Sequence, residues 1–199
     1  MSNNIEFFNQ VQTITMYEPL GEFLGSSAIQ EFRYSDVVKL SGHSCPTVAG
    51  AYLMTLYGLK ALYSEDEPIV RGNIKVEIKG AKGDGVIGVI ANVASFITGA
   101  KENDGFKGLG GIYARNNLLK FDANIKGEIR FTRIDTKASV EVSYNLANLA
   151  LSGFDQRLMQ KSLLNQASDD EVALFRKQWQ QRVKEILIDF CDKAVSVEY

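Results

Sequence analysis

His43 is the only histidine of this 199-residue chain, and it stands two residues before Cys45, one of only two cysteines, in the stretch SGHSCPTVAG. A thiolate and an imidazole are good ligands for zinc and other borderline divalent metals. The same two groups are the nucleophile and the base of a cysteine hydrolase. A third interpretation is a tight turn into a helix in which neither side chain does chemistry.

Each chemical interpretation of this pair needs partners from elsewhere. A metal held by one imidazole and one thiolate needs further donors to approach a tetrahedral site. Those donors would be a carboxylate, an amide, water or a second copy of the chain. A hydrolase needs an oxyanion hole and usually a residue that orients the histidine, and the sequence places neither. Cys45 precedes Pro46 at the expected N-cap of a long helix, where unpaired amide N–H groups stabilise a thiolate.

A second group of polar side chains interrupts the apolar run VIGVIANVASFITG. Asn92, Ser95 and Thr98 are spaced three apart, so they share one face of the helix that this run predicts. One interpretation is that they bond to each other, to water or to the backbone. The sharper interpretation is that they line a cavity opposite His43 and Cys45, with Asn92 contacting a metal or its water and Thr98 near a ligand.

A glycine-rich loop, KENDGFKGLGGIYARNN, follows this predicted helix. Glycine-rich loops can approach an anionic ligand closely, and Lys101 and Lys107 add positive charge. The loop lacks the Gly-Lys-Ser/Thr ending of a Walker A loop, and no single strand-loop-helix unit frames it as a Rossmann site. It is therefore either a ligand-binding loop or a plain mobile connection. The ligand-binding residues that we expect are Ser95, Thr98, Lys101 and Asn116.

The elements that must position these residues are helices and strands in one α+β arrangement. Apolar residues recur with helical spacing from Val48 to Leu62, and Pro46 suits the first helical position because its missing N–H would be unpaired there. Alternating apolar and polar residues predict strands, and RIDTKAS between two of them predicts a hairpin turn. The strands are expected in 28–34, 74–78, 118–124, 127–134 and 138–146, and the other helices in 35–42, 85–100, 146–166 and 168–195.

These elements predict an antiparallel sheet with packed helices and a helical C-terminal extension. We expect a core over residues 1–150, whose first 30 or so residues lead in, and the extension over 151–199. A capping box of Ser168 and Glu171 begins the last helix. Its apolar stripe, which includes Trp179, is expected to pack on the domain or on a partner subunit.

Composition narrows the class of protein. The net charge of −2 offers no electrostatic footprint for nucleic acid or an anionic membrane, so we expect neither as a partner. The apolar stretches are too short for a membrane span, and MSNNIEFFNQ does not read as a signal peptide. Two cysteines, Cys45 and Cys191, cannot form a disulfide framework. We therefore predict a cytoplasmic protein.

The stretch GHSCP, followed by Gly50 and a helix, resembles the opening Gly-His-x-Cys-Pro-Gly of the FmdE family, which takes its name from formylmethanofuran dehydrogenase. ANVASFITGA, the glycine-rich loop and NNLLKFDANIKGEIRFTR are similar to the family's second motif, which is a helix end, a loop and following strands. The order and spacing of the elements agree over roughly residues 36–144. The first motif is fairly specific and the second is degenerate.

The resemblance implies an α+β core, usually a homodimer, with a metal, often zinc, near the His-x-Cys motif. His43 and Cys45 match the motif and inherit that role. The sequence departs from the family pattern at several positions, and the C-terminal cysteine-rich zinc finger of some members is absent. The resemblance thus implies a thinner ligand set, with Zn²⁺ or another divalent transition metal held more loosely. The departures are Thr47 in place of Gly, Asn92 in place of Asp, Ser95 in place of Gln and Ala100 in place of Cys.

Three functions remain open at this point. The first is a metal-dependent enzyme or metallo-accessory protein that acts on a small polar ligand. The second is a non-catalytic binding or assembly module, with an oxidoreductase as its partner. The third is a metal-independent cysteine hydrolase that uses Cys45 and His43. A site short of ligands and a long apolar helical stripe both favour a homodimer.

Overall fold

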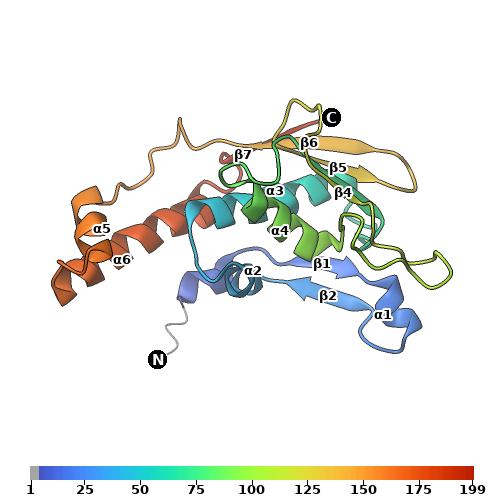
Figure 1. Ribbon diagram of the computed structural model, residues 1–199, viewed down its shortest axis with the longest axis horizontal. Helices are drawn as coiled ribbons and strands as arrows, with labels where there is room; N and C mark the ends of the chain where they lie inside the picture. Colours follow the sequence, from blue (N-terminus) through green and yellow to red (C-terminus); the bar gives the residue numbers. More distant parts are fainter. Residues whose placement is uncertain (1–4) are drawn as a thin grey trace.

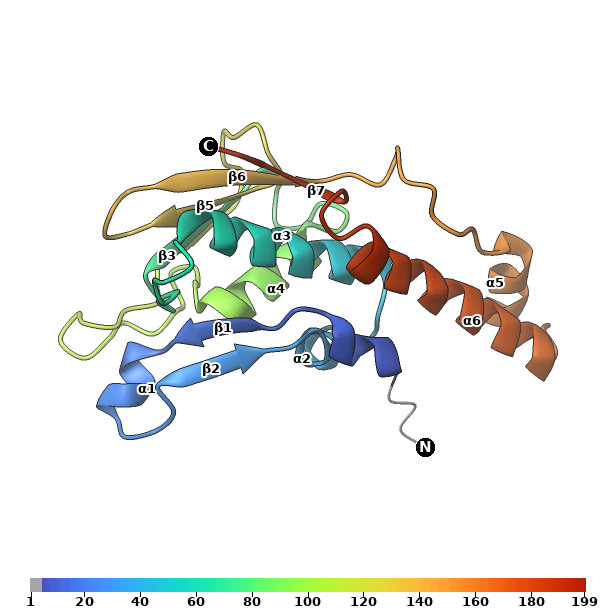
Figure 2. The same ribbon diagram turned by 180° about the vertical axis from the view of Figure 1, so that it is seen from behind.

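The computed structural model describes residues 5–199, and its centre is α3 (Pro46–Leu62), a helix that is buried along most of its length. Pro46 begins the helix, at a position where its missing N–H leaves no donor unpaired. The helix is apolar nearly all round, so other elements can cover it on several sides. Figures 1 and 2 show it between the main sheet and the antiparallel pair β1 (Ile14–Tyr17) and β2 (Ile29–Phe32).

The main sheet has five strands in the order β4-β3-β5-β6-β7. Every neighbouring pair is antiparallel except β3 and β4, which are parallel. Alternate side chains of β5 and β6 are buried, and these two strands pack on α3, as the period of two requires of a half-buried sheet. The strand β3 packs on the helix α4 (Ile87–Thr98). The strands are β3 (Ile74–Ile78), β4 (Leu119–Lys120), β5 (Ile129–Arg133), β6 (Ser139–Tyr144) and β7 (Val195–Glu198).

Further helical segments surround this centre. The helix α4 (Ile87–Thr98) packs along α3 and ends at Gly99, whose φ of 78° lies in the left-handed region. The paired helices α5 (Gln156–Leu163) and α6 (Asp169–Lys184) project from the core as a helical arm (Figure 1). The others are η1 (Glu6–Gln10), α1 (Pro19–Phe23), α2 (Tyr34–Ser41) and the π-helical turn η2 (Glu185–Asp189).

The α+β class is confirmed, as are the hairpin between β5 and β6 and the capping box that begins α6. Three parts differ from the sequence prediction. Residues 146–155 are not helical, because Asp155 caps α5 through the amide of Arg157 and the helix begins only there. The strand expected in 118–124 is only two residues long in the structure, β4 (Leu119–Lys120). The last residues form β7, which pairs with β6 and returns the C-terminal segment to the core sheet.

None of the helices in residues 5–199 combines the length and the apolar character that a membrane crossing requires.

Candidate functional site

His43 lies in the short connection between α2 and α3. Gly42 ends α2 in the left-handed region with a φ of 75°, and its amide donates to the carbonyl oxygen of Val38 at 2.8 Å. The exposed His43 follows, with Nδ1 at 2.9 Å from the carbonyl oxygen of Ser41. A carbonyl oxygen only accepts, so this bond needs the proton on Nδ1, and in the neutral imidazole Nε2 then carries the lone pair. Metal-binding histidines commonly donate one ring N–H to a carbonyl oxygen in this way and bind the metal through the other nitrogen.

Cys45 is the N-cap of α3 and is 9% exposed. Its backbone is extended, with φ −149° and ψ 167°, and its Sγ accepts a hydrogen bond from the amide of Val48 at 3.4 Å. Serine, threonine and aspartate fill this capping position most often. A cysteine here turns its sulfur toward the N-terminal amides of the helix, so the expected N-cap placement of Cys45 is present in the structure.

The side chain of the residue between His43 and Cys45 is held by a tyrosine of α2. The hydroxyl groups of Tyr34 and Ser44 are 3.1 Å apart, and both side chains are buried. Burial raises the pKa of Tyr34 well above its ordinary value of 10.0, while the bond to Ser44 acts in the opposite direction. The phenol therefore stays protonated at neutral pH and keeps this bond.

Tyr144 at the end of β6 holds the other side of Cys45. Its hydroxyl donates to the carbonyl oxygen of Pro46 at 2.8 Å, and burial raises the pKa of this phenol as well. Its ring lies on Gly50 so closely that a Cβ there would be 2.5 Å from Cε1. Gly50 is therefore required for the approach of the sheet to the first turns of α3.

The contribution of α6 to this region could not be found by sequence reasoning. Trp179 Nε1 and Gln180 Nε2 both donate to the carbonyl oxygen of Ser44, at 3.0 and 3.3 Å. The apolar stripe of the helix predicted burial of Trp179, but nothing in the sequence connects an indole with a carbonyl group 135 residues away. The helical arm thus contacts the His-x-Cys turn, residues 43–45, directly.

The three polar residues of α4 lie in two different environments. Ser95 and Thr98 are buried, whereas Asn92 is exposed. The Oγ of Ser95 donates to the carbonyl oxygen of Ala100 at 2.6 Å. Thr98 Oγ1 donates to the carbonyl oxygen of Ala94 at 2.7 Å and accepts from the amide of Ala100 at 3.2 Å. These two hydroxyl groups therefore stabilise the end of α4.

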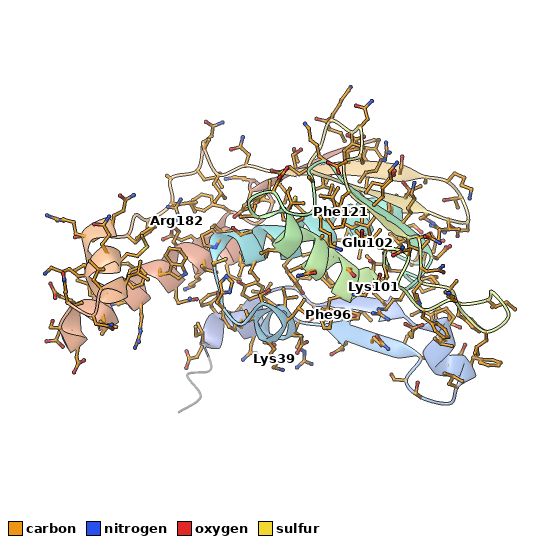
Figure 3. All side chains as sticks on the ribbon, in the orientation of Figure 1. Lys39, Phe96, Lys101, Glu102, Phe121 and Arg182 are labelled. Atoms are coloured by element: carbon orange, nitrogen blue, oxygen red, sulfur yellow. The ribbon has the colours of Figure 1, made fainter. Side chains whose placement is uncertain are left out.

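Asn92 lies one helical turn before Phe96 and shares its face of α4. Phe96 lines a cavity of about 600 Å³ together with Lys39 and Leu40 of α2, and Figure 3 labels Phe96 and Lys39 on these two neighbouring helices. Asn92 is exposed but does not line this cavity, so the structure does not bring it to His43 or Cys45.

Lys101 and Asn116 come together in the glycine-rich loop, at the other end of α4. Lys101 accompanies Glu102 just after the helix, at the opposite end of the α3 and α4 layer from the His-x-Cys turn (Figures 1 and 3). The amide of Lys101 donates to the carbonyl oxygen of Arg115 at 2.9 Å, and the amide of Asn116 donates to that of Phe106 at 3.3 Å. The structure thus separates these two residues from His43 and Cys45.

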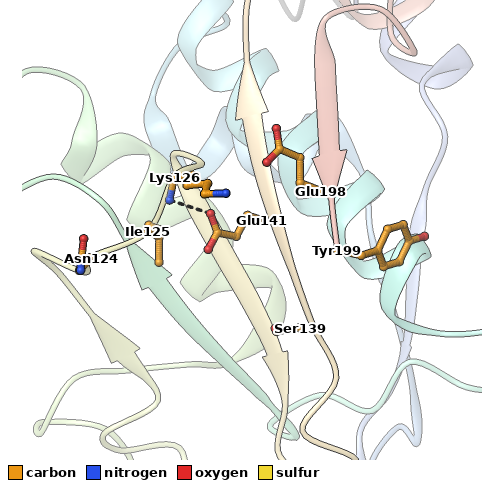
Figure 4. Close-up of a pocket in the computed structure, with 7 residues that line it drawn as sticks. All are labelled: Asn124, Ile125, Lys126, Ser139, Glu141, Glu198 and Tyr199. Carbon is orange, nitrogen blue, oxygen red and sulfur yellow. Dashed lines mark hydrogen bonds between the residues drawn. The ribbon is translucent and has the colours of Figure 1, made fainter.

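A further cavity, of about 500 Å³, lies at the edge of the sheet and is lined by Glu141 and Glu198 among others (Figure 4). Glu141 accepts from the amides of Lys126 and Gly127 at 2.7 and 2.8 Å. These bonds, that from Gly127 foremost, lower the pKa of Glu141. The carboxylate thereby holds the turn before β5, and its oxygen is occupied by the backbone.

Within residues 5–199, no three His, Cys, Asp or Glu side chains cluster closely enough to hold a metal ion. Two side chains of the His-x-Cys turn carry donor atoms that suit a transition metal, the imidazole nitrogen of His43 and the sulfur of Cys45. They make a partial ligand set.

Two comparisons with known proteins bear on these motifs. The FmdE family model, described as "Molybdenum formylmethanofuran dehydrogenase operon", matches residues 40–190 and so covers both the His-x-Cys turn and α6. The comparison with curated proteins gives no significant match. The family match extends over well more than half of the chain and includes the residues on which the sequence resemblance rested. The chain therefore belongs to the FmdE family.

Proposed function

We propose that this FmdE-family protein binds a divalent transition metal, with Zn²⁺ as the best fit, through His43 and Cys45. The observation that carries the proposal is the hydrogen bond between His43 Nδ1 and the carbonyl oxygen of Ser41, which leaves the lone pair on Nε2. An imidazole nitrogen and a thiolate in one short turn are the donor types that zinc prefers. The metal would supply Lewis-acid chemistry to a small polar ligand, as an enzyme or as an accessory protein.

Hydrogen bonds from α2, α6 and β6 hold the chain around Cys45. Trp179 and Gln180 hold the carbonyl group of Ser44, while Tyr34 holds its hydroxyl group. Tyr144 holds the carbonyl group of Pro46 on the other side. Preorganisation of this kind keeps a two-residue ligand pair in one geometry and lowers the entropic cost of binding.

The rest of the coordination is open, and we propose three sources for it. Asn92 is one, because it is an exposed amide one helical turn before Phe96, which lines the cavity beside α2. Water or the small ligand itself is the second. A second copy of the chain is the third, since His43 is exposed beside the arm of α5 and α6. A homodimer would thereby complete a site that one chain leaves partial.

Cobalt substitution tests the metal site with a readout besides activity. Co²⁺ bound to the Cys45 thiolate gives a sulfur-to-metal charge-transfer band in the near ultraviolet, and the Cys45→Ser variant should lose it. Cys191→Ser is the matched control, and it should keep the band because Cys191 lies outside the turn. Retention of the band in Cys45→Ser, or metal content below about a tenth of an equivalent after zinc addition, contradicts the proposal.

Alkylation separates the metal site from a metal-independent hydrolase. In the zinc-loaded protein, iodoacetamide should label Cys45 slowly, and a chelator should speed the labelling because it frees the sulfur. A metal-independent nucleophile would react equally fast before and after chelation. Equal rates would therefore favour the hydrolase interpretation of Cys45 and His43.

Asn92→Asp tests the third donor. An aspartate is a stronger, charged donor, so this substitution should tighten Zn²⁺ binding about tenfold if Asn92 contacts the metal or its water. The control is Asn124→Asp, which adds the same charge at an exposed position between β4 and β5. If the two variants have equal zinc affinity and an intact fold, Asn92 does not belong to the site.

A further inference from the structure

A buried ion cluster joins three distant parts of the chain. Glu18 precedes α1, Arg71 precedes β3, and Arg115 belongs to the glycine-rich loop. The two guanidinium groups meet the one carboxylate: Arg71 Nη1 lies 2.7 Å from Glu18 Oε2, and Arg115 Nη2 bonds to Oε1. The side chains of Glu18 and Arg115 are only 5% and 8% exposed. One carboxylate therefore faces two positive charges in a largely buried place.

Three donors already share the carboxylate of Glu18. Glu18 Oε2 accepts from Arg71, and Oε1 accepts from Arg115 and from the amide of Leu20 at 3.1 Å. Arg71 also donates to the carbonyl oxygens of Ile97 and Phe96, at 2.9 and 3.0 Å, at the end of α4. Both guanidinium groups are thus placed by the fold, and one of their two charges is not balanced by Glu18.

Arg115 Nη1 is buried and has no hydrogen-bond partner among the described residues. It lies against Gly72 and Gly99, both with positive φ, and a Cβ on Gly72 would overlap it. The backbone has therefore made room for the guanidinium group without providing an acceptor for it. Buried guanidinium donors are rarely left unpaired, because the N–H groups lose their hydration.

Arg115 also lines a cavity of about 360 Å³. Its lining includes Arg71, Gly99, Lys101 and Arg115, with the exposed Asp104 as the one acidic side chain. The loop that forms its wall is tied down by the backbone: the amide of Arg115 donates to the carbonyl oxygen of Phe106 at 2.7 Å. Three cations line a cavity whose size suits a small molecule.

We infer that this cavity binds an oxyanion, the carboxylate or phosphate group of a small molecule, which accepts a hydrogen bond from Arg115 Nη1. Planar guanidinium groups match the oxygen geometry of both anions, and Lys101 supplies a further charge at the mouth. The site lies at the other end of α4 from His43 and Cys45. Its binding is therefore independent of the proposed metal.

The test is calorimetric titration of the whole protein with inorganic phosphate and with sodium acetate, at low ionic strength. We expect saturable binding of at least one of them, with a dissociation constant below about 1 mM. Lys101→Ala should weaken it about fivefold to tenfold, because a charge-assisted contact is lost from an exposed side chain that the fold does not need. Lys107→Ala is the matched control, an exposed lysine of the same loop that does not line the cavity, and it should bind as the wild type does.

Arg115→Lys probes the unpaired donor itself, with thermal unfolding as the check on folding. It should abolish saturable binding while Cys45→Ser leaves binding unchanged. Absence of saturable binding by both anions overturns the inference, and so do equal losses in Lys101→Ala and Lys107→Ala. If Arg115→Lys does not fold, the comparison of Lys101→Ala with Lys107→Ala still tests the inference. Loss of binding in Cys45→Ser would also contradict it, because the site would then depend on the metal turn.

Discussion

The indole Nε1 of Trp179 donates a 3.0 Å hydrogen bond to the carbonyl oxygen of Ser44, which ties the helical arm to the His-x-Cys turn. The indole also packs edge-on against Phe154, with ring centroids 5.1 Å apart. One side chain therefore joins the arm to the conformation of the residues that flank Cys45.

Trp179→Phe keeps an aromatic ring in place and removes the indole donor. Removal of one hydrogen bond should lower the free energy of unfolding by about 1 kcal/mol. It should also weaken zinc binding several-fold, since the turn becomes less preorganised. Chemical denaturation and a competitive zinc titration measure the two effects. Phe175→Leu is the control, because Phe175 lies in the same aromatic cluster but makes no bond to Ser44. Equal losses of zinc affinity in both variants would assign the effect to packing alone.

Gly50→Ala tests the close approach of β6 to α3. The new Cβ would lie 2.5 Å from the ring of Tyr144, so strand and helix must separate, at a cost of about 1–3 kcal/mol in the free energy of unfolding. Gly153→Ala has no atom within 4 Å of its new Cβ and should be near neutral. Urea denaturation of the two variants and of Gly50→Ala combined with Tyr144→Ala checks the cause. The double variant should lose less stability than the sum of the two single variants, because the clash is shared.

The local parts of the fold could be read from the sequence. Pro46 and the helical spacing after it predicted α3 and placed Cys45 at its cap, since these signals lie within a few residues of each other. The strands of the main hairpin were predicted for the same reason, because RIDTKAS joins two alternating runs.

The long-range parts of the site could not be read in this way. Arg115 meets Glu18 across 97 residues, and in the sequence it is one arginine in a loop of glycines. The exposed edge of β6 gives β7 its pairing partner, and that edge exists only after folding. The spacing of Ser95 and Thr98 is compatible both with a face that lines a ligand site and with the backbone hydrogen bonds that the two side chains make. The sequence alone could not distinguish these two roles.

A buried arginine makes stability depend on pH in the acidic range. Arg133 donates to Glu67 and Asp135 at 2.6 and 2.7 Å, and these bonds hold the pKa of both carboxyl groups below their ordinary values. A group with a lowered folded-state pKa stabilises the fold fully above its unfolded pKa, about 4 here, and the stabilisation is lost as the pH falls further. Asp135→Asn should therefore lower the urea midpoint at pH 7 and have a smaller effect near pH 3, where part of the stabilisation from Asp135 is already lost. Asp66→Asn, at an exposed neighbour of Glu67, is the control and should shift neither midpoint. An effect of Asp135→Asn that is equal at both pH values would contradict the ion-pair origin.

The helical arm is the segment that we expect to mediate the proposed homodimer. Leu163 and Leu164 at the end of α5 are 74% and 65% exposed, and Leu174 of α6 is 48% exposed. Projecting helices that expose leucines gain stability when a second copy covers them, because burial of apolar area is favourable. Light scattering of the wild type should give twice the mass of one chain. The double variant Leu163→Asp and Leu164→Asp should give the mass of a single chain. Leu24→Asp is the matched control, an equally exposed leucine after α1, outside the arm. A monomeric wild type contradicts the dimer, and dissociation by Leu24→Asp alone would place the interface at α1. If the arm also brings a second copy to His43, the monomeric double variant should bind zinc more weakly than the dimeric wild type.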